Sequence, residues 1–175
     1  MYKILYKIKS PKDVKGLSIN DLKILSSELS NYIHEVVSEK GGHYSSPLGA
    51  VDLTIALHYV YNTPIDKLIW DVGHQAYAHK IITGRKNEFK SIRQYGGISG
   101  FLKIDESEFD CFGAGHASTS ISAGLGFAHS RDKDKKNHQI VGEIAQALNM
   151  TVSGIVAHES ALKDGELLKI PQYAL

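Results

Sequence analysis

The sequence has little that would support a covalent scaffold, a membrane span or a polyanionic partner. Cys111 is the single cysteine, so the chain can form neither an internal disulfide framework nor a zinc site built from several thiolates. No segment approaches the ~20 apolar residues of a membrane-spanning helix, and residues 1–9 lack the apolar core and cleavage site of a signal peptide. With 20 Lys and Arg against 19 Asp and Glu, the charge balance does not favour nucleic-acid binding. We therefore expect a soluble, cytoplasmic protein with no nucleic-acid or membrane partner.

The composition is that of an ordinary globular domain. The 175 residues are 42% hydrophobic and 22% charged, values that argue against disorder and against fibrous structure. A chain of this length buries roughly 70% of its unfolded surface, enough for a core without covalent cross-links. Two counts are high, 16 glycines and 9 histidines, and most of the glycines lie between Gly41 and Gly126.

The order of the predicted elements indicates an α/β domain with a parallel sheet, because short apolar segments, glycine turns and helical segments alternate. Ligands of such sheets bind at the carboxyl ends of the strands, which is where the glycine turns lie. Helices are predicted over residues 18–40, 49–61, 74–83 and 118–131, with a short helical piece near 88–94, and strands over 68–72, 109–112 and 140–142. The first helix has one apolar face, and the second is apolar almost all round, which predicts that it is buried between other elements.

Residues 113–120, GAGHASTS, stand between a predicted strand and a predicted helix. Glycines allow close approach to a ligand, and the first N–H groups of a helix form an anion site, so this segment is a candidate phosphate site. A dinucleotide site is not supported, because Ser118 stands where the fingerprint has its third glycine. The alternative is structural: the glycines form a tight turn, and Ser118 or Thr119 caps the helix.

Three of the nine histidines directly follow a glycine at a predicted element boundary: His43, His74 and His116. That shared context makes them candidates for a site, although a single histidine is more often a core or surface residue. His74 and His79 are five residues apart and therefore do not share a helix face, which argues against a metal pair. The remaining histidines are interpreted as ordinary helix, loop or tail residues: His34, His58, His79, His129, His138 and His158.

Cys111 and the charged run at residues 131–136 favour plain structural roles. Cys111 falls in a predicted apolar strand with nothing to lower its pKa, so nucleophilic catalysis by this thiol is not supported. The charged run mixes both signs and is predicted to be a solvated loop.

Five segments together resemble the 1-deoxy-D-xylulose-5-phosphate synthases, which are thiamine-diphosphate-dependent, transketolase-like enzymes. They follow one another in order over roughly residues 4–142. The segments are GGH at 41–43, LHYV at 57–60, WDVGHQ at 70–75, RQYGGISGF at 93–101 and GAGHASTS at 113–120.

The resemblance implies a partial thiamine-diphosphate-binding domain and the residues that form its site. By motif, His43 matches a catalytic histidine near the reacting thiazolium. His74 matches a histidine that contacts the cofactor's diphosphate, and Gly115, His116 and Ala117 match a Gly-His-Ser triplet that lines the cofactor. The family is a homodimeric transferase that condenses pyruvate with glyceraldehyde 3-phosphate, with loss of carbon dioxide, for isoprenoid, thiamine and pyridoxal precursors.

The sequence departs from the family pattern in two places. Ala117 replaces the family's serine, a change that backbone phosphate contacts can tolerate. After Gly142 the family has Gly-Asp-Gly, whose aspartate binds Mg²⁺, whereas this chain continues with Glu143 and Ile144. No metal ligand is therefore predicted, and residues 1–142 are assigned to the partial domain and 143–175 to a divergent tail.

Three hypotheses follow from these departures. The leading one is an amino-terminal fragment of the synthase that is inactive alone, because the metal motif and the later domains of the family are absent. The alternatives are a non-catalytic interaction module and one half of a split thiamine-diphosphate enzyme.

Overall fold

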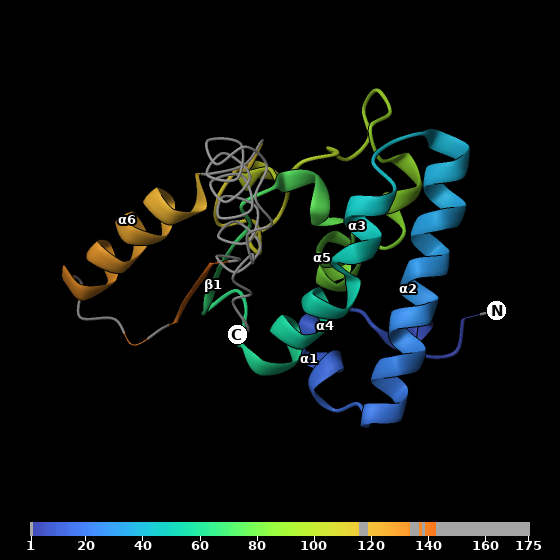
Figure 1. Ribbon diagram of the computed structural model, residues 1–175, viewed down its shortest axis with the longest axis horizontal. Helices are drawn as coiled ribbons and strands as arrows, with labels where there is room; N and C mark the ends of the chain where they lie inside the picture. The colour runs from blue at the N-terminus through green and yellow to red at the C-terminus, as the bar shows by residue number, and fades with distance from the viewer. Residues whose placement is uncertain (1, 116–118, 134–136, 138, 143–175) are drawn as a thin grey trace, which may run out of the picture.

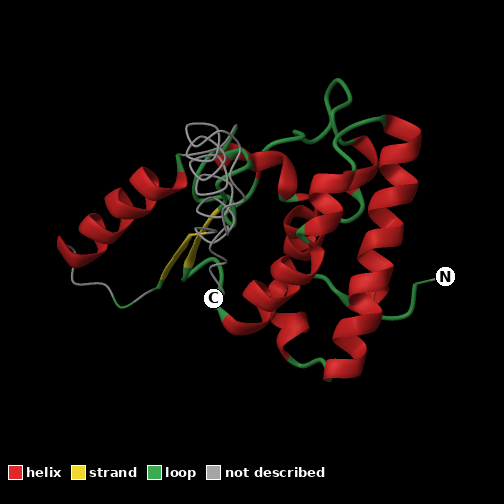
Figure 2. Ribbon diagram, viewed as in Figure 1, coloured by secondary structure: helices red, strands yellow, loops and turns green. Residues whose placement is uncertain are grey.

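The computed structural model describes residues 2–115, 119–133, 137 and 139–142 (Figure 1). Helices dominate these residues, and the strands are two short ones (Figure 2). The α-helices are α1 (Pro11–Lys15), α2 (Ile19–Lys40), α3 (Ser45–Gly49), α4 (Val51–Val60), α5 (Tyr77–Lys80) and α6 (Ser120–Lys133). Short 3-10 or π turns are η1 (Leu5–Lys7), η2 (Gly73–Gln75), η3 (Ile81–Arg85), η4 (Glu88–Ser91) and η5 (Ile104–Glu106), and the strands are β1 (Lys67–Ile69) and β2 (Ile140–Gly142).

Helix α2 begins and ends where local chemistry predicts. The Ser18 hydroxyl accepts a hydrogen bond from the Asp21 amide at 3.2 Å and donates one to the Asp21 carboxylate at 2.7 Å, which satisfies an otherwise unpaired helix donor. At the other end Gly41 has φ of 77° and Gly42 has φ of 142°, conformations that favour glycine. The predicted apolar face is confirmed, since Leu25, Leu29, Tyr32, Ile33, Val36 and Val37 are buried.

The second predicted helix is divided and only partly buried. Residues 49–61 were expected to form one buried helix, but α3 ends at Gly49 and α4 begins at Val51. Helix α4 packs against α1, α2 and α5, which leaves its last turn toward solvent, with Val60 64% exposed. The expectation of burial on all sides was therefore wrong for this turn.

Strands β1 and β2 pair in parallel, with Lys67 opposite Ile140 and Ile69 opposite Gly142. Helix α6, which precedes β2, packs on the same two strands, on the side of the molecule away from α2 (Figure 1). The described residues are thus mostly helical with a small parallel sheet, an arrangement compatible with the predicted α/β class. Strand β1 is shorter than the predicted 68–72.

Residues 109–112 are not a strand, contrary to the sequence prediction. The Asp110 amide donates to the Ser107 carbonyl in a turn, and the Asp110 side chain is buried among cations. Cys111 contacts β1 through its thiol, which donates to the Leu68 carbonyl at 3.1 Å, so a side chain takes the place of a backbone ladder.

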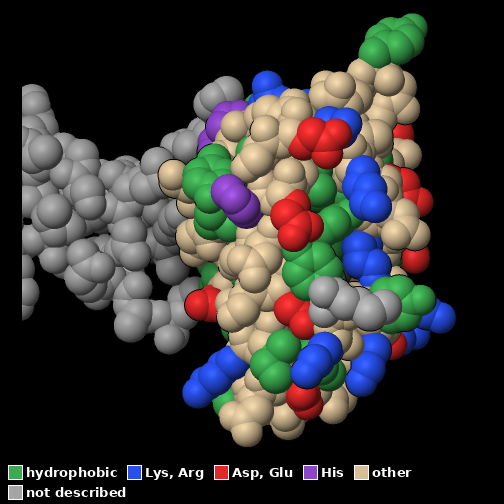
Figure 3. All heavy atoms as spheres, turned by 90° about the vertical axis from the view of Figure 1, so that its right-hand side faces the viewer, with side chains coloured by type: hydrophobic (Ala, Val, Ile, Leu, Met, Phe, Trp, Pro, Cys, Tyr) green, Lys and Arg blue, Asp and Glu red, His purple; other side chains and the backbone are tan. Residues whose placement is uncertain are grey.

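Two apolar clusters form the core of the described residues. The larger cluster lies between α2, the N-terminal arm (residues 2–9) and the α5–η4 segment. The smaller cluster packs α4 against β1 and includes Trp70 and Leu102. Acidic and basic side chains are interspersed over the face shown in Figure 3. Within the part of the chain that the structure describes, no helix combines the length and apolar character of a membrane span.

Candidate functional site

The structure stacks two of the three glycine-following histidines on each other. The His43 and His74 rings lie 3.9 Å apart between centroids and 13° from parallel. His43 directly follows the two glycines that end α2, and His74 lies in η2, five residues after Ile69, where β1 ends. Two of the three candidate histidines therefore lie side by side, beyond the carboxyl end of β1.

Gly73 brings the glycine turn at residues 113–115 next to the turn that carries His74. Its amide donates to the Gly115 carbonyl at 3.0 Å, and a Cβ at Gly73 would lie 1.9 Å from the Ala114 carbonyl oxygen. Only glycine fits this approach, because no real Cβ contact is so short. Gly115 is exposed, with open space where a side chain would be. The predicted site residues His116 and Ala117 lie outside the described residues.

Arg93 adjoins the histidine pair, and sequence analysis assigned it no role. Its Nη1 lies 3.3 Å from His43 Nδ1, and because a guanidinium only donates, Nδ1 accepts and the proton of a neutral His43 ring is on Nε2. Arg93 has φ of 62°, which is unusual for a residue with a side chain. Its stem lies between two glycines, since a Cβ at Gly42 or Gly100 would lie 3.4 or 2.8 Å from Arg93 carbon atoms.

Phe101 contacts both stacked rings. Its centroid is 6.1 Å from that of His43 and 6.2 Å from that of His74, with interplanar angles of 71° and 82°. These edge-to-face arrangements are favourable for aromatic rings. Phe101 therefore adds an apolar wall to a site whose other groups are nitrogen donors and acceptors.

The start of α6 differs from the sequence expectation of free N–H groups. The Ser120 amide donates to Asp71 Oδ1 at 3.0 Å, and Asp71 is 1% exposed. A carboxylate thus occupies this donor, so Ser120 does not contribute its N–H to a phosphate site. Gly115 is exposed beside the His74 turn, which supports the phosphate-site interpretation, whereas the acceptor at this helix start is Asp71, and Ser118 of the structural alternative lies outside the described residues.

A buried polar network joins Thr63, His58, His79 and Asp110. The interpretation of His58 and His79 as ordinary residues missed it. His79 Nε2 lies 3.2 Å from Asp110 Oδ1, His58 Nε2 lies 3.0 Å from His79 Nδ1, and Thr63 Oγ1 lies 3.0 Å from His58 Nδ1. Asp110 is a carboxylate paired with Arg85, so it accepts from His79 Nε2. With both rings neutral, Thr63 donates to His58 and His58 donates to His79.

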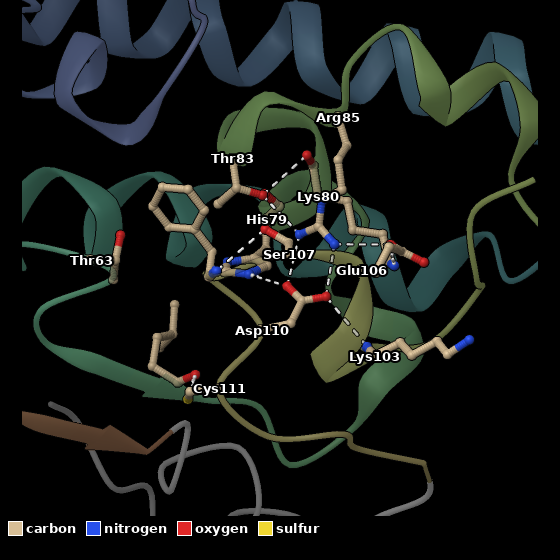
Figure 4. Close-up of polar contacts among 12 residues, drawn as sticks. Thr63, His79, Lys80, Thr83, Arg85, Lys103, Glu106, Ser107, Asp110 and Cys111 are labelled. Carbon is tan, nitrogen blue, oxygen red and sulfur yellow. Dashed lines mark hydrogen bonds and ion pairs between the residues drawn. The ribbon is translucent and has the colours of Figure 1, made fainter.

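Four charged residues form what we call the ionic cluster: Lys80, Arg85, Glu106 and Asp110 (Figure 4). Arg85 binds Asp110 in a two-pronged contact at 2.7 and 2.8 Å and reaches Glu106 at 2.9 Å. Lys80 Nζ pairs with Glu106. All four side chains are nearly or fully buried.

Burial and pairing shift the pKa values in this network in opposite directions. Burial lowers the pKa of His58 well below its usual value, and burial lowers that of His79 although Asp110 acts against it. Burial also lowers the pKa of Lys80, with Glu106 opposing. Burial would raise the pKa of Asp110, but hydrogen bonds from His79 and Arg85 hold it far below its ordinary range. The histidines are therefore neutral and Asp110 is charged at neutral pH.

The structure supports the interpretation of Cys111 as unreactive, although not in a strand. Burial raises the pKa of its thiol to about 11, so thiolate is scarce at neutral pH. Among the described residues, no group of three or more His, Cys, Asp or Glu side chains could hold a metal ion.

Imidazole, guanidinium and glycine backbone groups that meet beyond the end of a strand can donate hydrogen bonds to a phosphate, and α/β domains bind their ligands at that edge of the sheet. Comparison with known proteins makes the assignment specific. A family model described as 1-deoxy-D-xylulose-5-phosphate synthase matches residues 5–165. The chain belongs to the 1-deoxy-D-xylulose-5-phosphate synthase family.

Curated relatives carry the same family name. The chain is 57% identical over 141 residues to a 1-deoxy-D-xylulose-5-phosphate synthase of Dictyoglomus turgidum, covering 81% of this chain and 23% of the relative. It is 51% identical over 166 residues to that of Carboxydothermus hydrogenoformans, with coverages of 95% and 26%. For the synthase of Alkaliphilus oremlandii the identity is 47% over 169 residues, with coverages of 97% and 27%.

The chain spans about a quarter of the length of these relatives. The family match runs past Gly142 to residue 165, so the relatives are also similar to part of the segment assigned to a divergent tail. The domain boundary at 142 stays a prediction.

Proposed function

We propose that His74 and the adjoining glycine turns bind the diphosphate of thiamine diphosphate, with His43 beside them as the catalytic histidine, as part of a 1-deoxy-D-xylulose-5-phosphate synthase. When bound, this cofactor supplies the carbanion chemistry that joins pyruvate to glyceraldehyde 3-phosphate with loss of carbon dioxide. The observation that carries the proposal is the stacking of His43 on His74 at 3.9 Å, next to the Arg93 guanidinium.

The donor set fits a diphosphate. The groups that meet at the site are two imidazoles, a guanidinium and glycine backbone, and the exposed Gly115 leaves space for an anion. Hydrogen bonds from such groups to phosphate oxygens are charge-assisted and strong. In this proposal His74, Gly115, His116 and Ala117 hold the diphosphate, and His43 is the catalytic residue, which carries its proton at Nε2 because Nδ1 accepts from Arg93.

The described residues do not fit Mg²⁺, since they contain no cluster of ligands for a metal ion. The sequence has no Gly-Asp-Gly motif, and Glu143 and Ile144 follow Gly142 instead. We therefore propose that this 175-residue polypeptide binds the cofactor weakly and does not complete the reaction without further protein.

Assembly as a homodimer and a cytoplasmic location belong to the same proposal. Ile121 and Leu125 on α6 are 44% and 69% exposed. Apolar side chains so exposed along one helix support an additional packing partner.

Calorimetric titration with thiamine diphosphate tests the proposal. We expect wild-type protein to bind, and His74→Ala to bind at least about tenfold more weakly, because a hydrogen bond to a charged group contributes about 1.5–3 kcal/mol. His34→Ala is the matched control, because His34 lies on α2 and bonds to Tyr44 and Ser38, and its affinity should equal that of wild type.

Four results would contradict parts of this account. Equal affinity of His74→Ala and wild type would remove His74 from the site, and no binding by wild type at millimolar cofactor would remove the site itself. Binding that tightens strongly with Mg²⁺, or product from pyruvate and glyceraldehyde 3-phosphate, would show that the chain holds a complete metal site.

A further inference from the structure

The segment between Ser99 and Asp110 folds back on itself around two of its own carboxylates, those of Glu106 and Asp110. Glu106 Oε2 accepts from the Ser99 amide at 2.8 Å, and Asp110 Oδ2 accepts from the Lys103 amide at 3.3 Å. The same carboxylates pair with Lys80 and Arg85, which follow the His74 turn along the chain. The ionic cluster thus ties this segment to α5 and η3 (Figure 4).

Glu106 determines the backbone next to Phe101 through two hydrogen bonds in series. Its carboxylate accepts a hydrogen bond from the Ser99 amide, and the Ser99 hydroxyl accepts one from the Phe101 amide at 3.1 Å. Gly100, between them, is buried against the Arg93 stem, where a Cβ would lie 2.8 Å from Arg93 Cγ. The peptide over residues 99–101 is therefore held on both sides of the glycine.

Phe101 transmits this constraint to the histidine pair. Its ring edge meets both stacked imidazoles, at 6.1 and 6.2 Å between centroids. A displacement of residues 99–101 would therefore move the Phe101 ring, which is the apolar wall beside both His43 and His74. No described contact joins Glu106 directly to either histidine.

Stability alone does not account for this arrangement. The Lys80 side chain is fully buried and that of Glu106 is 13% exposed, and a buried ion pair gains little net free energy over apolar residues because desolvation offsets the attraction. Such a pair does define one geometry, since a buried charge without its partner is strongly unfavourable.

We propose that Glu106 is a positioning residue for the candidate site: through Ser99 it sets the place of Phe101 against the His43–His74 pair. The consequence for cofactor binding rests on the proposed function. The geometric statement does not, because it concerns contacts within this chain alone.

The test is the set of imidazole C–H signals in ¹H–¹³C NMR spectra of the 175-residue protein without ligand. An aromatic ring edge shifts the signals of neighbouring rings, so Phe101→Leu marks the signals of His43 and His74 that depend on Phe101. We expect Glu106→Gln to shift the same signals toward their Phe101→Leu positions, and to shift them no further in the double variant. Asp105→Asn, at the exposed neighbouring carboxylate, should leave them in place.

Ser99→Ala provides a second route if Glu106→Gln does not fold. It removes the acceptor of the Phe101 amide while leaving the ionic cluster intact, and it should shift the same two histidines. His34 and His129 are exposed on α2 and α6 and report general loosening, so their signals should not move. Unchanged His43 and His74 signals in a folded Glu106→Gln or Ser99→Ala variant, or equal shifts at all histidines, would overturn the proposal.

A titration of the same samples with thiamine diphosphate separates the two proposals. If both hold, Glu106→Gln binds the cofactor about threefold to tenfold more weakly, while Asp105→Asn matches wild type. If wild type fails to bind but the selective shifts are present, the proposed function is wrong and the positioning role of Glu106 stands.

Discussion

At the scale of single residues, the network from Thr63 to Asp110 has one consistent order of protons. Hydrogen bonds from Arg85 and His79 keep Asp110 ionised. His79 and His58 are then neutral rings: His79 accepts a hydrogen bond from His58, and His58 accepts one from Thr63. Both rings are fully buried. An added proton would place a charge in the core, and this cost gives the network a pH dependence.

We expect stability to fall as the pH drops below about 6.5, the ordinary histidine value. The folded-state pKa values of His58 and His79 are depressed, so between the folded and unfolded values the unfolded chain binds more protons. The stabilisation is complete above the unfolded pKa and is lost toward the folded pKa, at up to about 1.4 kcal/mol per pH unit for each ring. Carboxyl groups whose pKa is lowered, such as that of Asp110, contribute to this loss of stability only in stronger acid.

Urea denaturation at pH 7.5, 6.5 and 5.5 checks this prediction, with the fluorescence of Trp70, the single tryptophan, as the signal. Trp70 is buried and its ring lies 5.7 Å from His79. His58→Gln should lower stability at pH 7.5 but flatten the decline toward pH 5.5. His34→Gln should keep the wild-type slope, and the same slope in His58→Gln would contradict the assignment.

At the scale of elements, Glu28 on α2 holds the N-terminal arm. Its carboxylate accepts from the amides of Lys3, Ile4 and Leu5 at 2.6, 2.9 and 2.7 Å. Burial would raise the pKa of Glu28, but these three donors lower it. The arm then places Leu5 in the larger core cluster.

Glu28→Gln should loosen the arm, because a neutral amide satisfies three donors less well than a carboxylate. We expect the free energy of unfolding to fall by about 1–2 kcal/mol, and the amides of Lys3, Ile4 and Leu5 to exchange with solvent faster. Hydrogen exchange measures this directly. Glu39→Gln is the control, because Glu39 is exposed and pairs only with the adjacent Lys40 among the contacts described. Unchanged exchange at these three amides would show that packing alone holds the arm.

Elements defined by local chemistry were predictable from the sequence, and long-range contacts were not. Ser18 and the glycines at 41–42 bounded α2 because caps and left-handed turns act over a few residues. Residues 109–112 have an apolar pattern typical of a strand, but Asp110 is held in a turn by Arg85, which is 25 positions away. No short-range pattern shows such a pairing.

In the candidate site, too, local sequence predicts one part, and long-range contacts determine the other. The glycine-following context of His43 and His74 indicated that they share a site, and the structure stacks them. The roles of Arg93 and Phe101 depend on a chain path that brings residues 93–101 to α2 and η2. Buried charges such as Glu106 resemble surface residues in a sequence, and only their packing shows that they are paired.

At the scale of the whole molecule, the described residues form a helical unit with a two-stranded parallel sheet, and the histidine pair lies near the carboxyl end of β1. This is where an α/β domain binds its ligand. The resemblance to the family predicts its diphosphate site at these histidines, and the described residues there supply nitrogen donors for an anion.

The most direct test of this account is an NMR titration of ¹⁵N-histidine-labelled protein with thiamine diphosphate, thiamine and inorganic diphosphate. We predict that thiamine diphosphate and inorganic diphosphate shift the imidazole signals of His43 and His74 at lower concentrations than thiamine does, while His34 stays unchanged. Equal responses to thiamine and thiamine diphosphate, or shifts at His34 but not at His43 and His74, would contradict a diphosphate site at the histidine pair.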